Sequence, residues 1–281
     1  MTSLRERVAT PARAAGVYAL LVAGALAAIG PLLLTVSTAI KTPSDFASHS
    51  ALAPPQPPST VNFAELLGGS HNLTHSIWVT AAVTAFVVLT QVTFSILAAF
   101  AFARLTFPGR EPLFWVYLST LMIPQAVTVV PLYLMMVQFG LRDTFWGLVL
   151  PLCFGSPYAI FLLRERFRAI PQEVVDAARL DGVSTLDMLV EIVIPLSRPI
   201  IVTLTLITVV SQWNSFMWPR IVTSGTQWQV LTVATAALQG QYNSHWTLVT
   251  AAAVIAMAPI VTLFVLTQKH IVRSILITGF R

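Results

Sequence analysis

The chain carries six apolar runs of roughly bilayer-spanning length, and these runs constrain its fold more than any other feature. A helix of about 20 residues crosses the hydrocarbon core of a bilayer. In lipid, only helices and closed barrels satisfy every backbone polar group. The composition agrees, because 56% of the 281 residues are hydrophobic and 10% are charged. We therefore predict an all-α integral membrane protein with a single transmembrane domain at residues 14–281, and with spans at about 14–40, 73–103, 112–139, 145–163, 199–219 and 245–268.

Prolines within two of the runs predict irregular helices. Pro124 and Pro131 fall in the third run, and Pro151 and Pro157 fall in the fourth. A proline removes a helical hydrogen bond, so these spans should be kinked and packed against neighbouring helices. Residues 41–72 contain further clustered prolines, and we predict there a loop outside the membrane that is extended around the prolines.

The basic residues predict the orientation of the chain. With six spans both termini lie on one side of the membrane, and that side holds thirteen of the sixteen Lys and Arg residues. Lys41, Arg142 and Arg220 face the other side. Because positively charged loops stay cytoplasmic, we expect a cytoplasmic N-terminal segment at residues 1–13 and a cytoplasmic C-terminus. The first run is too long for the core of a signal peptide, so we expect it to be retained as a span.

Residues 171–195, PQEVVDAARLDGVSTLDMLVEIVIP, carry charges at regular intervals in a chain that is otherwise mostly apolar. Pro171 suits the first turn of a helix, and Gly182 suits its C-terminal end. Ser184, with an acidic residue three positions on, resembles a capping box that starts a second helix. Pro195 should end this second helix. We predict two short helices joined at Gly182 and exposed at the cytoplasmic surface.

This segment resembles the E-A-A-x-x-D-G…I-x-L-P loop of ABC importer permeases, through Asp176-Ala177-Ala178-x-x-Asp181-Gly182 and Ile192-x-Ile194-Pro195. The resemblance implies coupling helices that dock into a groove of a separate ATPase subunit. Adjacent alanines let another backbone approach closely, while the carboxylates and Arg179 set the register. An aspartate stands where the family usually has glutamate, and its carboxylate is shorter. The implied coupling residues are Asp176, Ala177, Ala178, Arg179, Asp181 and Gly182.

Further motifs resemble the carbohydrate branch of this family, which includes the smaller permease of the maltose system. They are Phe107-Pro108-Gly109-Arg110, Ile123-Pro124 with Pro131-Leu-Tyr133, and Gly140-Leu-Arg-Asp-Thr144. This resemblance implies the fold of a type I ABC importer permease. The final residues 277–281 differ from the longer Gly/Ala-rich tail that in such systems can contact the ATPases.

The resemblance also implies a set of partners in a bacterial cytoplasmic (inner) membrane. They are a second permease that completes a heterodimer, two ATPase subunits and an extracytoplasmic solute-binding protein. ATP and Mg²⁺ would bind to the ATPase subunits, and this chain would bind no cofactor. Transport of a sugar would then proceed by alternating access.

A cluster of amides and aromatic rings late in the fifth run is a candidate for the solute pathway. Aromatic faces and amides suit sugar rings, which present apolar C–H faces and hydroxyl edges. The W-N-x-F-x-W-P pattern there also resembles sugar-importer permeases. We take Gln212, Trp213 and Asn214 as pathway residues, and we interpret Trp218 as part of an aromatic belt at the membrane interface.

Several activities lack the residues that they require. No Asp, Glu, Lys or Arg falls inside the six runs as drawn, and we interpret the charged segment 164–168 as the membrane surface. Ion-coupled carriers usually hold such a group at mid-membrane. The sequence has no phosphate-binding G-x-x-x-x-G-K-[ST] loop, no catalytic constellation and no metal-ligand cluster. We therefore expect a non-catalytic subunit that binds neither metal nor nucleic acid.

Other functions remain open from the sequence alone. The chain could import glycerol phosphates or peptides, although an anionic solute favours a basic group in the path. An ion-coupled secondary carrier is the alternative from another class. A third alternative is a structural membrane scaffold, in which the 171–195 segment would have no function.

Overall fold

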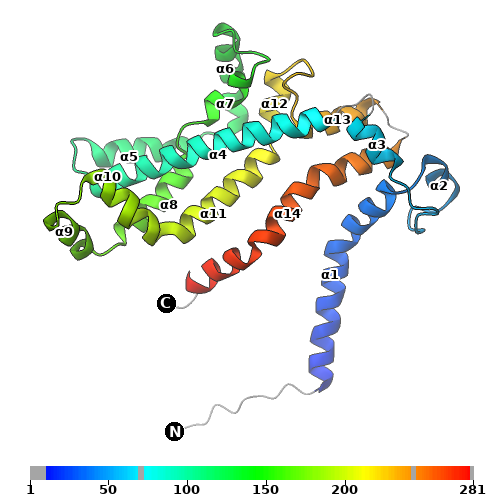
Figure 1. Ribbon diagram of the computed structural model, residues 1–281, viewed down its shortest axis with the longest axis horizontal. Coiled ribbons are helices and arrows are strands. Elements are labelled where there is room, and N and C mark those ends of the chain that lie inside the picture. The colour runs from blue at the N-terminus through cyan, green and yellow to red at the C-terminus, as the bar shows by residue number, and fades with distance from the viewer. Residues whose placement is uncertain (1–10, 69–72, 242–244, 279–281) are drawn as a thin grey trace. The chain divides into compact units, whose positions relative to one another are not determined.

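The computed structural model describes residues 11–68, 73–241 and 245–278 (Figure 1). Residues 1–10 of the predicted N-terminal segment and residues 279–281 of the tail lie outside these ranges. Within them the chain is helical and contains no strand, which confirms the all-α prediction. The chain forms two compact units, Met1–Asn72 with Leu238–Met257, and Leu73–Ala237 with Ala258–Arg281.

The helices differ greatly in length, and three short stretches are 3₁₀- or π-helical instead of α-helical. The first unit contains α1 (Pro11–Ala39), α2 (Pro43–Ser48) and α3 (Val61–Gly68). The second contains α4 (Leu73–Arg104), α5 (Arg110–Ser119), α6 (Gln125–Gln138), α7 (Phe145–Val149), α8 (Pro157–Arg168), α9 (Gln172–Leu180), α10 (Thr185–Asp187), α11 (Ile194–Trp213) and α12 (Met217–Val222). The unit boundaries fall within α13 (Leu231–Gln241) and α14 (Trp246–Thr278), so both units contain part of each helix. The second unit also contains two 3₁₀ segments, η1 (Thr120–Met122) and η2 (Leu150–Leu152), and the π-helical η3 (Met188–Val193).

Residues 41–72, predicted as a loop extended around its prolines, are non-helical at 54–58 as predicted but form the short helices α2 and α3 on either side. Buried donors explain the difference. Asn62 Nδ2 donates to the carbonyl oxygens of Ala39 and Lys41, both at 2.8 Å. The ammonium of Lys41, which is fully buried, donates to Ser50 O at 3.1 Å. These side chains supply the backbone partners that an extended loop takes from water.

Among the described residues, four helical stretches are long and apolar enough to cross a membrane, and two bent pairs raise the number to six when each pair counts as one span. The pairs bend by 101° and 40°, which confirms that the third and fourth spans are kinked. The fifth span was predicted to begin at residue 199, but its helix begins at Thr185. The stretches are Ala15–Ala39, Leu73–Arg104, Thr185–Val222 and Trp246–Gln268, and the pairs are Arg110–Met122 with Gln125–Gln138 and Phe145–Leu152 with Pro157–Arg168.

The second unit has two hydrophobic clusters, and the long helix α4 contributes to both of them. The α8 cluster contains Leu163, Phe167 and Val193 together with Phe100 and Phe102 of α4. The α7 cluster contains Val149, Trp218 and Val222 together with Val83 and Val87 of α4. Along this length α4 packs against α8 and α11 (Figure 1). Since it is unbroken, α4 joins the two clusters mechanically.

Polar side chains of α4 stabilise the break between η2 and α8. Gln91 Nε2 donates to Leu152 O at 3.0 Å, and Ser95 Oγ accepts from Ser156 N at 2.9 Å. Non-helical backbone at membrane depth is tolerated when neighbouring helices satisfy its freed groups in this way. The fourth span is therefore broken without leaving these backbone groups unpaired.

Candidate functional site

The candidate site is α9 together with the turn that follows it. Val175 and Ala178 are buried in the α8 cluster and fix one face of the helix. The helix ends in a Schellman motif, in which Val183 N donates to Ala178 O at 3.0 Å and Gly182 N donates to Arg179 O at 3.1 Å. Gly182 has φ +76°, and open space surrounds the position of a Cβ. Glycine is needed there for its left-handed backbone conformation alone, which confirms the predicted turn.

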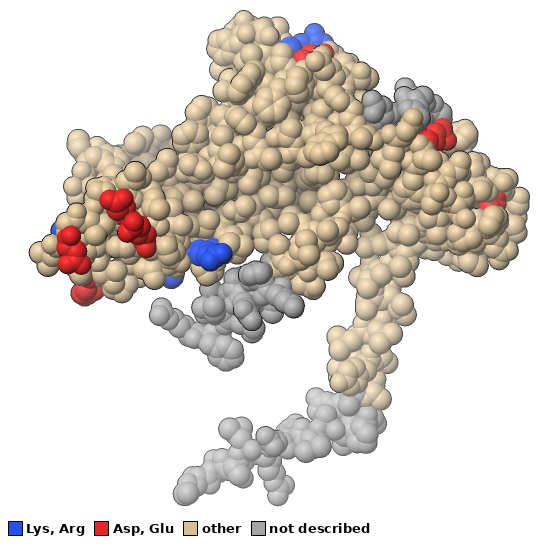
Figure 2. Space-filling view, viewed as in Figure 1, with Lys and Arg blue, Asp and Glu red and all other residues tan. Residues whose placement is uncertain are grey.

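The opposite face of α9 is exposed and carries both acidic and apolar side chains. Because side chains of a helix advance by about 100° per residue, positions 173, 176, 177 and 180 lie opposite the buried pair. Leu180 is 89% exposed. Figure 2 shows acidic side chains gathered on the surface over α9. The small side chain of Ala177 lies on the same face as this leucine. The exposed face comprises Glu173, Asp176, Ala177 and Leu180, with Asp181 exposed at the helix end.

The ion pair between Arg179 and Asp176 is long and exposed. Arg179 Nη1 lies 3.9 Å from Asp176 Oδ1, and both side chains are more than half exposed. Exposed pairs of this kind contribute little to stability, typically below about 1 kcal/mol. Arg179 therefore remains available to a partner protein.

The second helix of the predicted pair starts as expected and ends differently. Ser184 is its N-cap, and its hydroxyl accepts from Asp187 N at 3.2 Å, which confirms the capping prediction. Pro195 does not end the helix, so that prediction was wrong. The π-helical η3 runs directly into α11, so Pro195 lies inside a continuous helix, just after a segment where the α-helical hydrogen-bond pattern is already interrupted.

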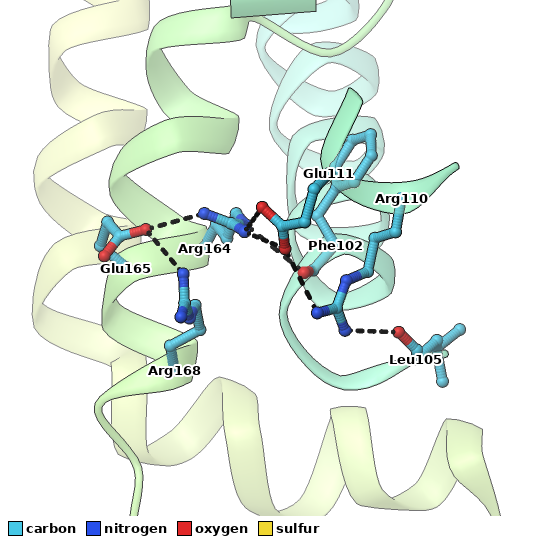
Figure 3. Close-up of polar contacts among 7 residues, drawn as sticks. All are labelled: Phe102, Leu105, Arg110, Glu111, Arg164, Glu165 and Arg168. Carbon is cyan, nitrogen blue, oxygen red and sulfur yellow. Dashed lines mark hydrogen bonds and ion pairs between the residues drawn. The ribbon is translucent and has the colours of Figure 1, made fainter. Parts of the chain in front are cut away.

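Arg164, in the segment predicted to mark the membrane surface, is buried and joins α8 to α4 and α5. The side chain is 3% exposed, its Nη2 donates to both carboxylate oxygens of Glu111 at 2.7 Å, and its Nε donates to Phe102 O at 3.4 Å (Figure 3). The guanidinium also lies 4.0 Å from the ring centre of Phe114. A sequence signal existed, because Arg164 lies three and four residues from Phe167 and Ile160 of the buried face.

The structure separates the three pathway candidates at the end of α11. Trp213 is buried, whereas Gln212 is partly exposed and Asn214 is exposed. The amide of Asn214 donates to Val210 O at 2.8 Å, as a C-terminal cap. Three consecutive residues of a helix point in different directions, so these side chains do not converge.

Trp218 does not belong to an aromatic belt, and that interpretation was wrong. It is 2% exposed within the α7 cluster, and its Nε1 donates to Gly147 O at 3.2 Å. Across the described residues, no group of three or more His, Cys, Asp or Glu side chains could hold a metal ion.

Comparisons with known proteins agree with this geometry. Residues 78–277 match the family described as "Binding-protein-dependent transport system inner membrane component". The chain is 30% identical to the sn-glycerol-3-phosphate transport system permease protein UgpE of Rhizobium meliloti, over 93% of this chain and 95% of that protein. It is 28% identical to the arabinooligosaccharides transport system permease protein AraQ of Halalkalibacterium halodurans, over 74% of this chain and 72% of that protein.

Its fold matches a chain of a solved bacterial ABC transporter that imports the acidic polysaccharide alginate. The TM-score is 0.81 at 23% identity, and the match covers 95% of this chain and 99% of that one. At this level of identity the likeness establishes the fold.

Proposed function

This chain belongs to the family of binding-protein-dependent transport system inner membrane components, and we propose that its 171–195 segment is the surface through which a separate ATPase drives transport. The chain is a permease of the ABC importer type, with the type I fold and several spans in the inner membrane. The proposal concerns which residues couple it to ATP hydrolysis, which partners it has and which solute it carries.

The exposed face of α9 is the observation that carries the coupling proposal. Leu180 is 89% exposed and lies beside the small Ala177 and the carboxylates of Glu173 and Asp176. Such an apolar side chain gains free energy when it leaves water for the groove of a partner protein. The buried face and the Schellman turn hold this surface rigidly, so little conformational freedom is lost on docking.

The charge distribution of the sequence supports a cytoplasmic position for this surface and for both termini. ATP is available on that side. The remaining partners follow from the same proposal: a second permease, two ATPase subunits that bind ATP and Mg²⁺, and an extracytoplasmic binding protein. In this assembly, closure of the ATPases moves α9, and the helices packed on it open the solute path outward.

For the solute we propose a mono-, di- or oligosaccharide. The similarity to an arabinooligosaccharide permease supports this class, and so does the absence of acidic and basic side chains at positions 199–219 as drawn from the sequence. A second candidate is a glycerol phosphate, which the 30% identity to UgpE favours. Purification of the cognate binding protein with its bound ligand decides between them.

The test of the coupling proposal is purification of the intact complex from its native membrane. With the wild-type chain we expect a P-loop ATPase and a second permease to co-purify. Leu180→Asp should lose the ATPase and retain the second permease. Leu52→Asp is the matched control, because Leu52 is also a highly exposed leucine (74%) but lies in the 41–72 segment, away from α9 in the chain. Recovery of the ATPase with Leu180→Asp, or ATP-independent solute movement by the chain alone in liposomes, would show that the coupling proposal is wrong.

A further inference from the structure

Arg104, the last residue of α4, makes polar contacts with the segment that enters α9. Its Nη2 donates to the carbonyl oxygens of Phe167 at 2.5 Å and Ile170 at 2.6 Å. Phe167 O lies in the last turn of α8 and also accepts from Ile170 N at 3.3 Å, whereas Ile170 O lies in the link between α8 and α9. Its Nη1 donates to Gln172 Oε1 at 2.9 Å. One guanidinium thus binds the end of α8 and the first residue of α9 together.

Gln172 continues this contact to the exposed face. Its Nε2 donates to Asp176 Oδ1 at 2.9 Å, one helical turn further on. The amide is therefore an acceptor toward Arg104 and a donor toward Asp176. Since an amide has both functions and a carboxylate or an ammonium has one, glutamine is suited to link a cation to an anion.

Capping of α8 does not account for the whole arrangement. Bonds to Phe167 and Ile170 satisfy the helix end without Gln172. The Nη1 group of Arg104, which donates to Gln172, contributes nothing to that cap. Its effect is on Asp176, whose carboxylate would otherwise turn freely on an exposed surface and lose that freedom on docking.

We propose that Arg104 and Gln172 are positioning residues that hold the Asp176 carboxylate in its docking orientation and tie α9 to the end of α4. The proposal rests on the coupling role assigned to α9 above. It adds a path for the movement, because α4 is the helix that contributes to both hydrophobic clusters. A displacement of α9 by the ATPase would then be passed to α4 through a side-chain contact as well as through the chain that links α8 to α9.

Substitutions at Gln172 separate the two halves of this contact. Gln172→Glu still accepts from Arg104 but cannot donate to Asp176, and it places a like charge one turn away. We expect the reconstituted complex to lose about three- to tenfold of its ATP-driven uptake. The amount of inserted permease and its melting temperature should stay unchanged. Gln227→Glu, at an exposed glutamine in the loop between α12 and α13, is the matched control.

A double-mutant cycle distinguishes positioning from a general effect on the fold. In an Asp176→Ala background, Gln172→Glu should have no further effect, because there is no carboxylate left to orient. Arg104→Lys should show a similar loss of uptake, since one ammonium cannot reproduce a planar fork that reaches three acceptors. Normal uptake by Gln172→Glu, or an undiminished effect in the Asp176→Ala background, would overturn the proposal.

The outcomes also separate this proposal from the coupling role on which it rests. Impaired uptake in Asp176→Ala and Leu180→Asp with normal uptake in Gln172→Glu would refute the positioning role alone. Normal uptake in all three variants would refute the coupling role, and the positioning role with it.

Discussion

Two arginines that lie fifteen positions apart in the chain occupy opposite environments, and their difference shows how this permease divides its charges. Arg164 of α8 is buried and contacts two carboxylates, a backbone carbonyl and an aromatic ring. Arg179 of α9 is exposed and lies 3.9 Å from a single carboxylate. The first holds helices together, and the second is free to meet another protein. Charges of the same type thus serve as scaffold in α8 and as surface in α9.

Removal of the buried arginine should have the largest effect. Arg164→Ala leaves Phe102 O and the Phe114 ring without their cation and opens a space inside the α8 cluster. We expect a loss of about 2–4 kcal/mol and little folded protein in the membrane. Thermal unfolding in detergent and the yield of monodisperse protein measure this. Arg168→Ala, a half-exposed arginine of the same helix, is the control and should change the melting temperature little.

Distortion of the turn after α9 should abolish transport and spare the scaffold. Gly182→Pro requires φ near −65° where the structure has +76°, and it removes the N–H that bonds Arg179 O. We expect no uptake, with membrane insertion intact. Gly182→Asn is the control, because asparagine tolerates the left-handed region, and it should retain most of the uptake. Equal uptake by the proline and asparagine variants would remove the turn from the coupling mechanism.

Added bulk on the exposed face should weaken assembly and leave stability unchanged. Ala177→Leu places a larger side chain where Ala177 leaves room for another backbone, and leucine is nearly as good a helix former as alanine. Overpacking costs typically about 1–3 kcal/mol, so we expect roughly tenfold weaker binding of the ATPase or more. Titration of purified ATPase against the permease complex in nanodiscs measures it. An unchanged affinity would place the docking groove elsewhere.

Local signals allowed much of the site to be predicted from the sequence. The glycine turn at Gly182 and the cap at Ser184 depend on a few neighbouring residues, and both are confirmed. Pro195 misled the prediction because a proline ends an α-helix only where its N–H is required. The π-helical segment before it shifts the hydrogen-bond register, and a sequence pattern does not reveal that shift.

Contacts between distant segments could not be predicted in this way. The burial of Trp218 depends on Gly147, which is 71 positions away, and the burial of Arg164 depends on Glu111 of another helix. Arg104 and Gln172 are 68 positions apart. Hydropathy identifies the helices that enter the membrane, but it does not tell which of their faces meet. A sequence analysis therefore assigns charged residues near the ends of spans to the surface, although some of them are buried between helices.

Removal of the exposed Arg179 should have the smallest effect, and it tests most directly whether Arg179 differs in role from Arg164. Arg179→Ala removes an exposed pair one turn apart, so the melting temperature should change by less than the equivalent of about 0.5 kcal/mol. If Arg179 sets the register of docking, the ATPase affinity should fall modestly, by about threefold, and the deficit should shrink as salt rises, because salt screens exposed charges. A thermal melt beside an affinity titration at low and high salt separates the two quantities. A large fall in melting temperature with unchanged affinity would mean that Arg179, like Arg164, belongs to the scaffold. The division of charges between α8 and α9 would then be wrong.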